Sequence, residues 1–353
     1  MALFKKKADE EKKTEREKVE ERREEVLARG RRFKYPLQYA KHKVVTLTVI
    51  ISVFALLAAG TFVYFMLYKY QSTDDLFYRI TQIFPYPVAT IDDEKVRYSD
   101  YLLLYRSSIT PIEKQGMVEQ GQNAEEMQKY YKREALTTAE NYTYALKLSR
   151  ELGIKVSDEE VDKAVELHRK AGGVERSEDT FTRVLQDNFG LSLSEYRRII
   201  YLSLISEKVS EKIDELAKIV SDEVKGYLDE GKNLKDISES LAGKATYEET
   251  GGLVDKMNID GGRSTMALTL EKGKTSERFV STSGDGFYFV TLIDKTESTV
   301  NYNSLFIPFT ELKTRLEKIR KEGKVNERIT IEEEKKDGEN PEQNQDQKQE
   351  ENN

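Results

Sequence analysis

The chain has 353 residues, a formal net charge of −7, no cysteine and only two histidines, His42 and His168. The missing cysteines exclude disulfides, thiol catalysis and Cys-ligated metals, and two histidines so far apart along the chain leave no His-based metal site or catalytic triad. No G-x-x-x-x-G-K phosphate loop occurs either, so we expect no metal and no small-molecule cofactor.

The charge is distributed unevenly along the chain. Residues 1–43 hold fifteen Lys and Arg against nine Asp and Glu, a net of +6, which leaves −13 on the remainder. An acidic body argues against nucleic-acid binding. Within this arm, residues 5–28 form a charged helical pattern without an apolar stripe, which is more typical of a solvated helix or frayed arm than of a docking helix.

The longest apolar run extends from Val44 to Leu67 and contains no charged side chain in 24 residues. As a helix it would be roughly 36 Å long, enough to cross a hydrocarbon core of about 30 Å. A buried core helix is the alternative, but such helices seldom run this far without a polar face. We predict a transmembrane helix over residues 44–68, and the membrane is therefore the first expected partner.

The residues on either side of this segment predict its orientation. Residues 29–43 carry six basic side chains and no acidic one, whereas Asp74 and Asp75 follow the span. Basic flanks stay in the cytoplasm, so the body is expected to be extracytoplasmic. Nucleic acid is the alternative ligand of this basic cluster, but its position at the membrane edge makes topology, or contact with anionic lipid, the commoner cause. A cleaved signal peptide is disfavoured because both the leader and the apolar run are too long, so we expect an uncleaved single-pass anchor in the cell membrane.

The first elements after the span are short. Residues 69–85 are predicted to be a linker that leaves the membrane through aromatic side chains. A hairpin follows, with strands at residues 88–91 and 95–97 around Asp92-Asp93-Glu94. A helix then begins at about Ser99.

Four further helices are expected before residue 218. Residues 123–152 have apolar side chains at helical spacing and end at Gly153, a usual residue just past a helix end. A short helix covers residues 181–189. The pairs Ser157 with Glu160 and Ser192 with Glu195 have the spacing of a capping box, and they open helices that run to residue 170 and through residue 216. Together these elements predict a helical domain over residues 86–218.

The composition changes after residue 219. Two helical pieces surround Gly231, and several glycines then separate short β-like runs. Residues 287–293 are the clearest strand, residues 303–309 are a second, and a short helix follows. The tail over residues 332–353 has no apolar side chain and is expected to be disordered. The predicted fold is mainly α with a small α+β domain over residues 219–331.

Several of these segments resemble the SurA/PrsA/PpiD type of extracytoplasmic chaperones. The entry strand VATIDD (88–93) and the junction LGIKVSDEEV (152–161) are similar to recurring motifs of the SurA N-terminal domain, and LSLSEYRR (191–198) is similar to a later helix. LEKGKTS (270–276) and GFYFV (286–290) are similar to the end of a parvulin prolyl-isomerase domain. The resemblance covers about residues 86–309 and implies a helical chaperone domain followed by a parvulin-like antiparallel sheet domain.

The parvulin resemblance has clear departures. A parvulin carries one His in its first strand and one in its last, and the last-strand position is Tyr288 in this chain. The proline-pocket Phe of the family falls near Ser264, and no first strand of the expected kind precedes Tyr227. Residues 300–309, VNYNSLFIPF, resemble that missing strand and would place Ser304 at the other His position. We hypothesise a circularly permuted, His-less parvulin-like domain in which this segment pairs antiparallel beside residues 287–293.

The resemblance implies a membrane-anchored chaperone, of holdase or foldase type, for unfolded secreted or envelope polypeptides. A second possibility is an active peptidyl-prolyl isomerase, in which the hydroxyl of Tyr288 or Ser304 donates a hydrogen bond to the twisting imide. A third is an envelope scaffold with one fixed protein partner. The resemblance would also allow the cytoplasmic arm to contact the secretion translocon. The peptide-binding residues expected on this basis are Val254, Met257, Met266, Phe287, Tyr288 and Phe306.

Overall fold

The computed structural model describes residues 15, 17–30, 36–114, 116, 123–170, 176–256, 258 and 260–331. The chain divides into two compact units, residues 1–70 and 71–353. In the first unit the described residues are helical up to Tyr68, and α2 (Pro36–Tyr68) is the longest of the described elements. Its portion Lys43–Tyr68 is long and apolar enough to cross a membrane, in agreement with the predicted anchor. The predicted tail at residues 332–353 lies outside the described residues.

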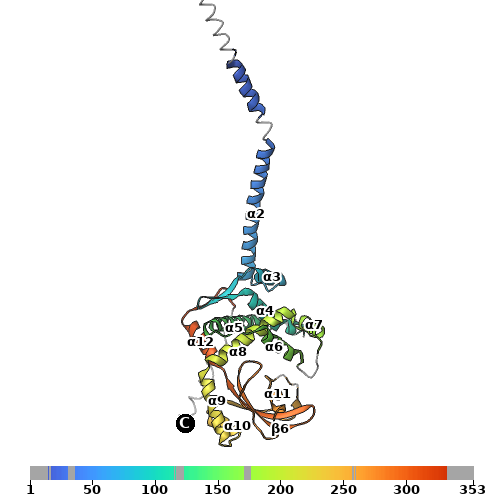
Figure 1. Ribbon diagram of the computed structural model, residues 1–353, viewed down its shortest axis with the longest axis vertical. Helices are drawn as coiled ribbons and strands as arrows, with labels where there is room; N and C mark the ends of the chain where they lie inside the picture. The colour runs from blue at the N-terminus through green and yellow to red at the C-terminus, as the bar shows by residue number, and fades with distance from the viewer. Residues whose placement is uncertain are drawn as a thin grey trace, which may run out of the picture. The chain divides into compact units, whose positions relative to one another are not determined.

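The second unit begins with a mostly helical domain, and it contains the hairpin and the long helix predicted from the sequence. In order its elements are α3 (Asp75–Ile83), β1 (Pro87–Ile91), β2 (Glu94–Arg97), α4 (Tyr98–Lys114), α5 (Asn123–Leu152), α6 (Asp158–Lys170), α7 (Glu178–Phe189) and α8 (Leu193–Ile213). Helix α5 packs against both α4 and α8 (Figure 1). Helix α3 lies where we expected only a linker, so that prediction was wrong.

Both predicted capping boxes are formed. At the start of α8, the backbone N–H of Glu195 donates to Ser192 Oγ at 3.3 Å, and the backbone N–H of Ser192 donates to Glu195 Oε2 at 2.7 Å. At the start of α6, the corresponding distances between Ser157 and Glu160 are 3.3 and 2.9 Å. Each box satisfies backbone donors that the first helical turn leaves unpaired.

The small domain is built on an antiparallel sheet. Its elements are α9 (Glu215–Asp229), α10 (Leu234–Ser240), β3 (Thr246–Glu249), β4 (Val254–Asp255), α11 (Arg263–Leu268), β5 (Phe279–Val280), β6 (Gly286–Lys295) and β7 (Thr299–Pro308). The strand order is β3-β7-β6-β5, and β4 also pairs with β7. The pairing predicted for residues 303–309 beside residues 287–293 is confirmed, with Phe287 opposite Ile307 and Phe289 opposite Leu305.

Successive residues of these strands are buried on opposite faces of the sheet, as the two-residue period of a strand requires. On one face Phe287, Phe289, Leu305 and Ile307 form a core with residues of α9 and α10. On the other face Val290, Leu292, Val300 and Tyr302 pack with Ala267 of α11. The β6–β7 hairpin is therefore covered by helices on both sides.

After β7 the chain returns to the helical domain. Helix α12 (Glu311–Lys321) packs against α5 and α8 (Figure 1), and β8 (Val325–Glu327) pairs antiparallel with β1 to give a sheet of order β2-β1-β8. Residues 311–331, which the sequence analysis placed in the small domain, thus complete the helical domain. The small domain is an insertion between α8 and α12.

The two chain crossings between these domains meet at Asp214. We expected the helix that contains α8 to continue through Leu216, but it ends at Ile213 and α9 begins at Glu215. The Asp214 side chain, which is buried, accepts from the backbone N–H of Ala217 at 2.9 Å with Oδ1. Its Oδ2 accepts from the N–H groups of Thr310 and Glu311 at 2.6 and 2.9 Å. One carboxylate therefore caps α9 and also binds the first amides of α12.

Candidate functional site

The sheet places three of the predicted site residues on one face of the small domain. Tyr288 lies opposite Phe306 across the β6–β7 ladder, and Ser304 lies opposite Val290, one position further along that face. The rings of Tyr288 and Phe306 are stacked, with centroids 4.7 Å apart and planes inclined by 23°. Phe279 of β5 extends the aromatic cluster on the other side of Tyr288, at 6.1 Å. The predicted pairing of strands is what brings these residues together.

Arg263 of α11 covers this aromatic cluster. Its guanidinium carbon is 5.1 Å from the centroid of the Tyr288 ring, a cation–π distance. Nη1 forms an ion pair with Glu248 of β3 at 2.5 Å, and Nε donates to the backbone carbonyl of Asp260 at 2.7 Å. Three contacts therefore hold the positive charge of Arg263 beside Tyr288.

The hydroxyl of Tyr288 is a proton donor at neutral pH. It donates to Asp285 Oδ2 at 3.2 Å. Burial raises the pKa of the Tyr288 phenol well above its ordinary value, and the nearby Asp285 carboxylate raises it further. The phenol has one proton, so Tyr288 can donate a hydrogen bond to a bound carbonyl group only in place of Asp285, and it cannot act as a general base near pH 7.

A buried carboxylate, Asp260, orders the other end of this face. It accepts from the Tyr302 hydroxyl at 2.6 Å and from the Ser264 hydroxyl at 2.5 Å, and the Ser264 backbone N–H lies 3.1 Å from it. Ser264, at the position of the family's proline-pocket Phe, is fully buried. This position therefore presents no aromatic surface to a proline side chain.

Ser304 is buried next to this network, and its hydroxyl makes no hydrogen bond with any described residue. A pocket of about 240 Å³ opens beside it, and Val254, Asp260, Arg263 and Tyr302 also contribute to the lining. An unpaired buried hydroxyl costs free energy unless a partner reaches it. The pocket is large enough to admit a peptide group or a few water molecules that would supply that partner.

The remaining predicted residues do not all belong to this face. Phe287 points into the opposite core, where it packs edge-to-face on Phe309 at 4.8 Å, so its assignment to the peptide-binding set was wrong. Met266 is a half-buried residue of α11, and Met257 lies outside the described residues. Arg263 and Asp260 were not among the predicted site residues. The local pattern that could have indicated them is the spacing of four residues between Asp260 and Ser264, across Gly261-Gly262.

No metal centre is evident among the described residues, where no group of three or more His, Asp and Glu side chains is placed to hold an ion. On this face Asp260 is paired with Tyr302 and Ser264, Arg263 is paired with Glu248, and Ser304 lines the pocket. The chemistry that this face offers is hydrogen-bond donation beside an aromatic surface.

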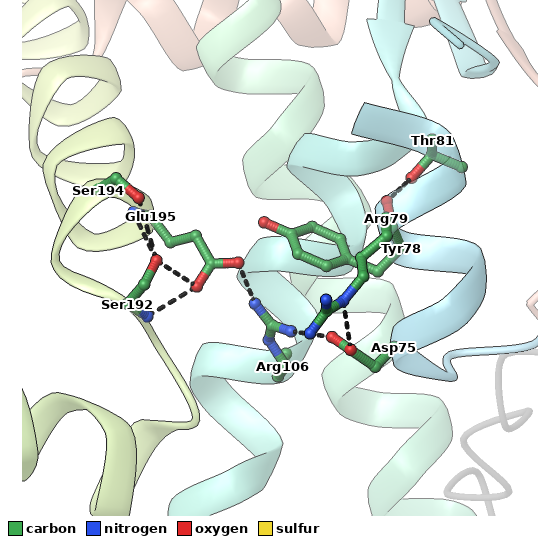
Figure 2. A network of polar contacts seen from close by, with 8 residues as sticks. All are labelled: Asp75, Tyr78, Arg79, Thr81, Arg106, Ser192, Ser194 and Glu195. Carbon is green, nitrogen blue, oxygen red and sulfur yellow. Dashed lines mark hydrogen bonds and ion pairs between the residues drawn. The ribbon is translucent and has the colours of Figure 1, made fainter. Parts of the chain in front are cut away.

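A second polar cluster lies in the helical domain and joins α3, α4 and the start of α8. Figure 2 shows Arg106 of α4 between two carboxylates, with Nη2 2.5 Å from Glu195 and Nη1 3.0 Å from Asp75. The guanidinium also lies 4.2 Å from the ring centroid of Tyr78. Burial and a hydrogen bond with Glu195 raise the pKa of the Tyr78 phenol. This cluster fastens α3 to the helical domain.

A comparison with known protein families gives a match for the helical domain. Residues 37–210 match the family model for the SurA-like N-terminal domain. The match begins in α2 and ends in α8, so this part of the chain is similar to the SurA-like N-terminal domain. A comparison with curated proteins returned no match. The small domain lies outside the matched residues, so its parvulin-like character stays a prediction.

Proposed function

We propose that this chain is a membrane-anchored extracytoplasmic chaperone that binds unfolded secreted or envelope polypeptides. The observation that carries the proposal is the SurA-like match, which extends from residue 37 in the apolar helix α2 to residue 210 in α8. The anchor and the chaperone-type domain thus belong to one continuous unit of sequence. The six basic residues before the span support an extracytoplasmic position of the body.

The body offers apolar surface to such clients. A soluble domain buries most of its large apolar side chains, and those that stay exposed in groups mark interaction surfaces. Leu216 and Ile219 form one exposed pair on α9, three residues apart and therefore on one side of the helix. Further exposed apolar side chains of the body include Leu152, Leu167, Phe189 and Leu253.

The small domain would serve as a second binding surface rather than as an efficient isomerase. Tyr288 and Ser304 occupy the positions that resemble the two parvulin histidines, and both can donate a hydrogen bond. Isomerase activity is the second candidate function, and the unpaired Ser304 hydroxyl beside its pocket is the observation that favours it. The two candidates differ in what they predict for peptide-bond isomerisation.

An assay of the full chain in phospholipid nanodiscs separates these functions. We expect it to suppress aggregation of a chemically unfolded client protein. We also expect it to accelerate cis–trans exchange of an Ala-Pro peptide by no more than about twofold over the slow uncatalysed rate. The double variant Leu216→Ser/Ile219→Ser should suppress aggregation less well, whereas Lys225→Ser on the same helix should match the wild type. Rapid isomerisation that Tyr288→Phe or Ser304→Ala abolishes would make the chain an enzyme.

The proposed topology has its own test. Protease added to intact cells, once any outer barrier is opened, should digest the chain after about residue 70 and leave the N-terminal arm protected, because the basic flank remains in the cytoplasm. In inverted membrane vesicles the arm should become accessible and the body protected. The reverse pattern would contradict the extracytoplasmic assignment, and digestion of both parts in sealed vesicles would contradict a membrane span.

A further inference from the structure

Helix α3 has an exposed apolar side. Leu76 and Ile83 are 63 % and 74 % exposed, and Ile80, between them, is half-buried. At 100° per residue these three side chains lie on one stripe of the helix. The opposite side carries Phe77, Tyr78 and Thr81, which are buried against the helical domain. Most of the apolar stripe is therefore open to the surroundings.

The chain itself limits where this stripe can lie. Helix α2 ends at Tyr68 and α3 begins at Asp75, so six residues connect them. A fully extended connection of this length spans roughly 25 Å at most. Tyr64, Tyr68 and Tyr70 cluster where the apolar segment ends, as aromatic side chains do at a membrane–water interface. The connection therefore keeps the first residue of α3 no further than about 25 Å from the end of the span, which lets α3 reach the headgroup region.

The inner side of α3 is fixed to the helical domain, so the outer stripe cannot turn inward. Arg106 binds Asp75 of α3 and Glu195 of α8 together, and its guanidinium lies against the Tyr78 ring (Figure 2). Arg79, beside the stripe, is exposed and forms an ion pair with Asp75 at 2.7 Å. Because this basic residue is already partnered, the surface has no excess of positive charge that would require anionic lipid.

We propose that the Leu76–Ile80–Ile83 stripe of α3 docks into the interfacial layer of the bilayer that α2 spans, with lipid acyl chains as its occupant. The inference rests on the proposed membrane anchorage. A short helix with an apolar side of this kind lies in the plane of the interface, with that side buried about 5–10 Å deep. Since α3 is fastened to α4 and α8, docking would set the orientation of the helical domain relative to the membrane.

The absence of tryptophan from the chain permits a direct test. Single tryptophans are introduced by Phe54→Trp in α2, Ile83→Trp in α3 and Leu253→Trp in the small domain, all at exposed positions. Each full-length variant is reconstituted in phosphatidylcholine nanodiscs with or without brominated acyl chains, which quench tryptophan on contact. We expect bromination to reduce the emission of Phe54→Trp and Ile83→Trp by roughly half or more, and to leave Leu253→Trp unchanged. Leu76→Trp is a second reporter on the same stripe.

The outcomes separate the inference from the proposed anchorage. Quenching of Phe54→Trp alone would retain the membrane anchor and overturn docking of α3. Loss of quenching at all positions would overturn both. Equal quenching of all the variants would show that the body adsorbs to lipid without a defined face, which also overturns the inference. Matching thermal transitions of the variants and the wild type verify that the substitutions leave the fold intact.

Discussion

Replacing Ile307 by Asp is expected to unfold the small domain. Ile307 is 1 % exposed and lies opposite Phe287 in the β6–β7 ladder, where its side chain enters the core with α9 and α10. A carboxylate placed there would lose its hydration and gain no counterion from that core. The expected cost is about 4–5 kcal/mol, which is close to the entire stability of many domains. Thermal unfolding followed by circular dichroism, together with limited proteolysis between residues 215 and 309, measures the effect.

Ile293→Asp is the matched control, because Ile293 belongs to the same hairpin and is 37 % exposed. We expect it to change the free energy of unfolding by less than about 1 kcal/mol. If both variants melted like the wild type, residues 303–309 would not be an internal strand of the sheet, and the permutation hypothesis would fail with it.

Replacing Arg320 by Met should destabilise the helical domain through Glu140. Glu140 of α5 is fully buried, and its carboxylate forms an ion pair with Arg320 of α12. Arg133 binds Glu327 of β8 with two bonds of 2.9 Å, and Arg320 also lies 3.6 Å from Glu327. Removing one partner of a buried ion pair typically costs about 3–5 kcal/mol, because the remaining charge stays buried without compensation. Denaturant unfolding at pH 8 measures this loss.

The pH dependence identifies Glu140 as the cause. Burial raises the pKa of Glu140 to about 7, above its ordinary value, although the Arg320 charge opposes that rise. The folded protein therefore binds more protons than the unfolded chain between those two values, and stability falls as the pH rises through this window. Arg320→Met should cost less at pH 5, where the carboxyl is neutral. Glu140→Gln/Arg320→Met should recover most of the loss at pH 8, and an equal cost of Arg320→Met at both pH values would exclude Glu140 as its source.

The parts of the fold that the sequence predicts correctly depend on neighbouring residues. Both capping boxes need only a Ser and a Glu three residues apart, and the β6–β7 hairpin needs two β-prone runs joined by a polar turn. The same local logic places Tyr288, Ser304 and Phe306 on one face, once antiparallel pairing and a two-residue period are assumed. The same two-residue period places Phe287 on the other face, because adjacent strand residues point to opposite sides of the sheet. The prediction that grouped Phe287 with Tyr288 did not apply this period.

The features that escaped prediction depend on contacts between distant segments. Strand β8 has three residues and becomes a strand only because β1 supplies its partner. Helix α8 ends just before Asp214, whose carboxylate accepts hydrogen bonds from the backbone N–H groups of Thr310 and Glu311. Both residues are far from Asp214 in the sequence. Arg263 joins the Tyr288 face from a helix of six residues, whose direction no periodicity reveals. Helix α3 was missed for a different reason, since its nine residues are too few to separate from the aromatic connection before it.

The return of α12 and β8 to the helical domain sets an order of events during synthesis. A chain made from its N-terminus presents β1, α5 and α8 long before residues 311–331 leave the ribosome. Until then the outer edge of β1 has no strand beside it, and Glu140 has no Arg320 to neutralise it. The inserted domain has all of its own strands by residue 308 and can form first. Of the two domains, the helical one begins earlier in the sequence and is finished later, because it closes only after residues 311–331 have been delivered.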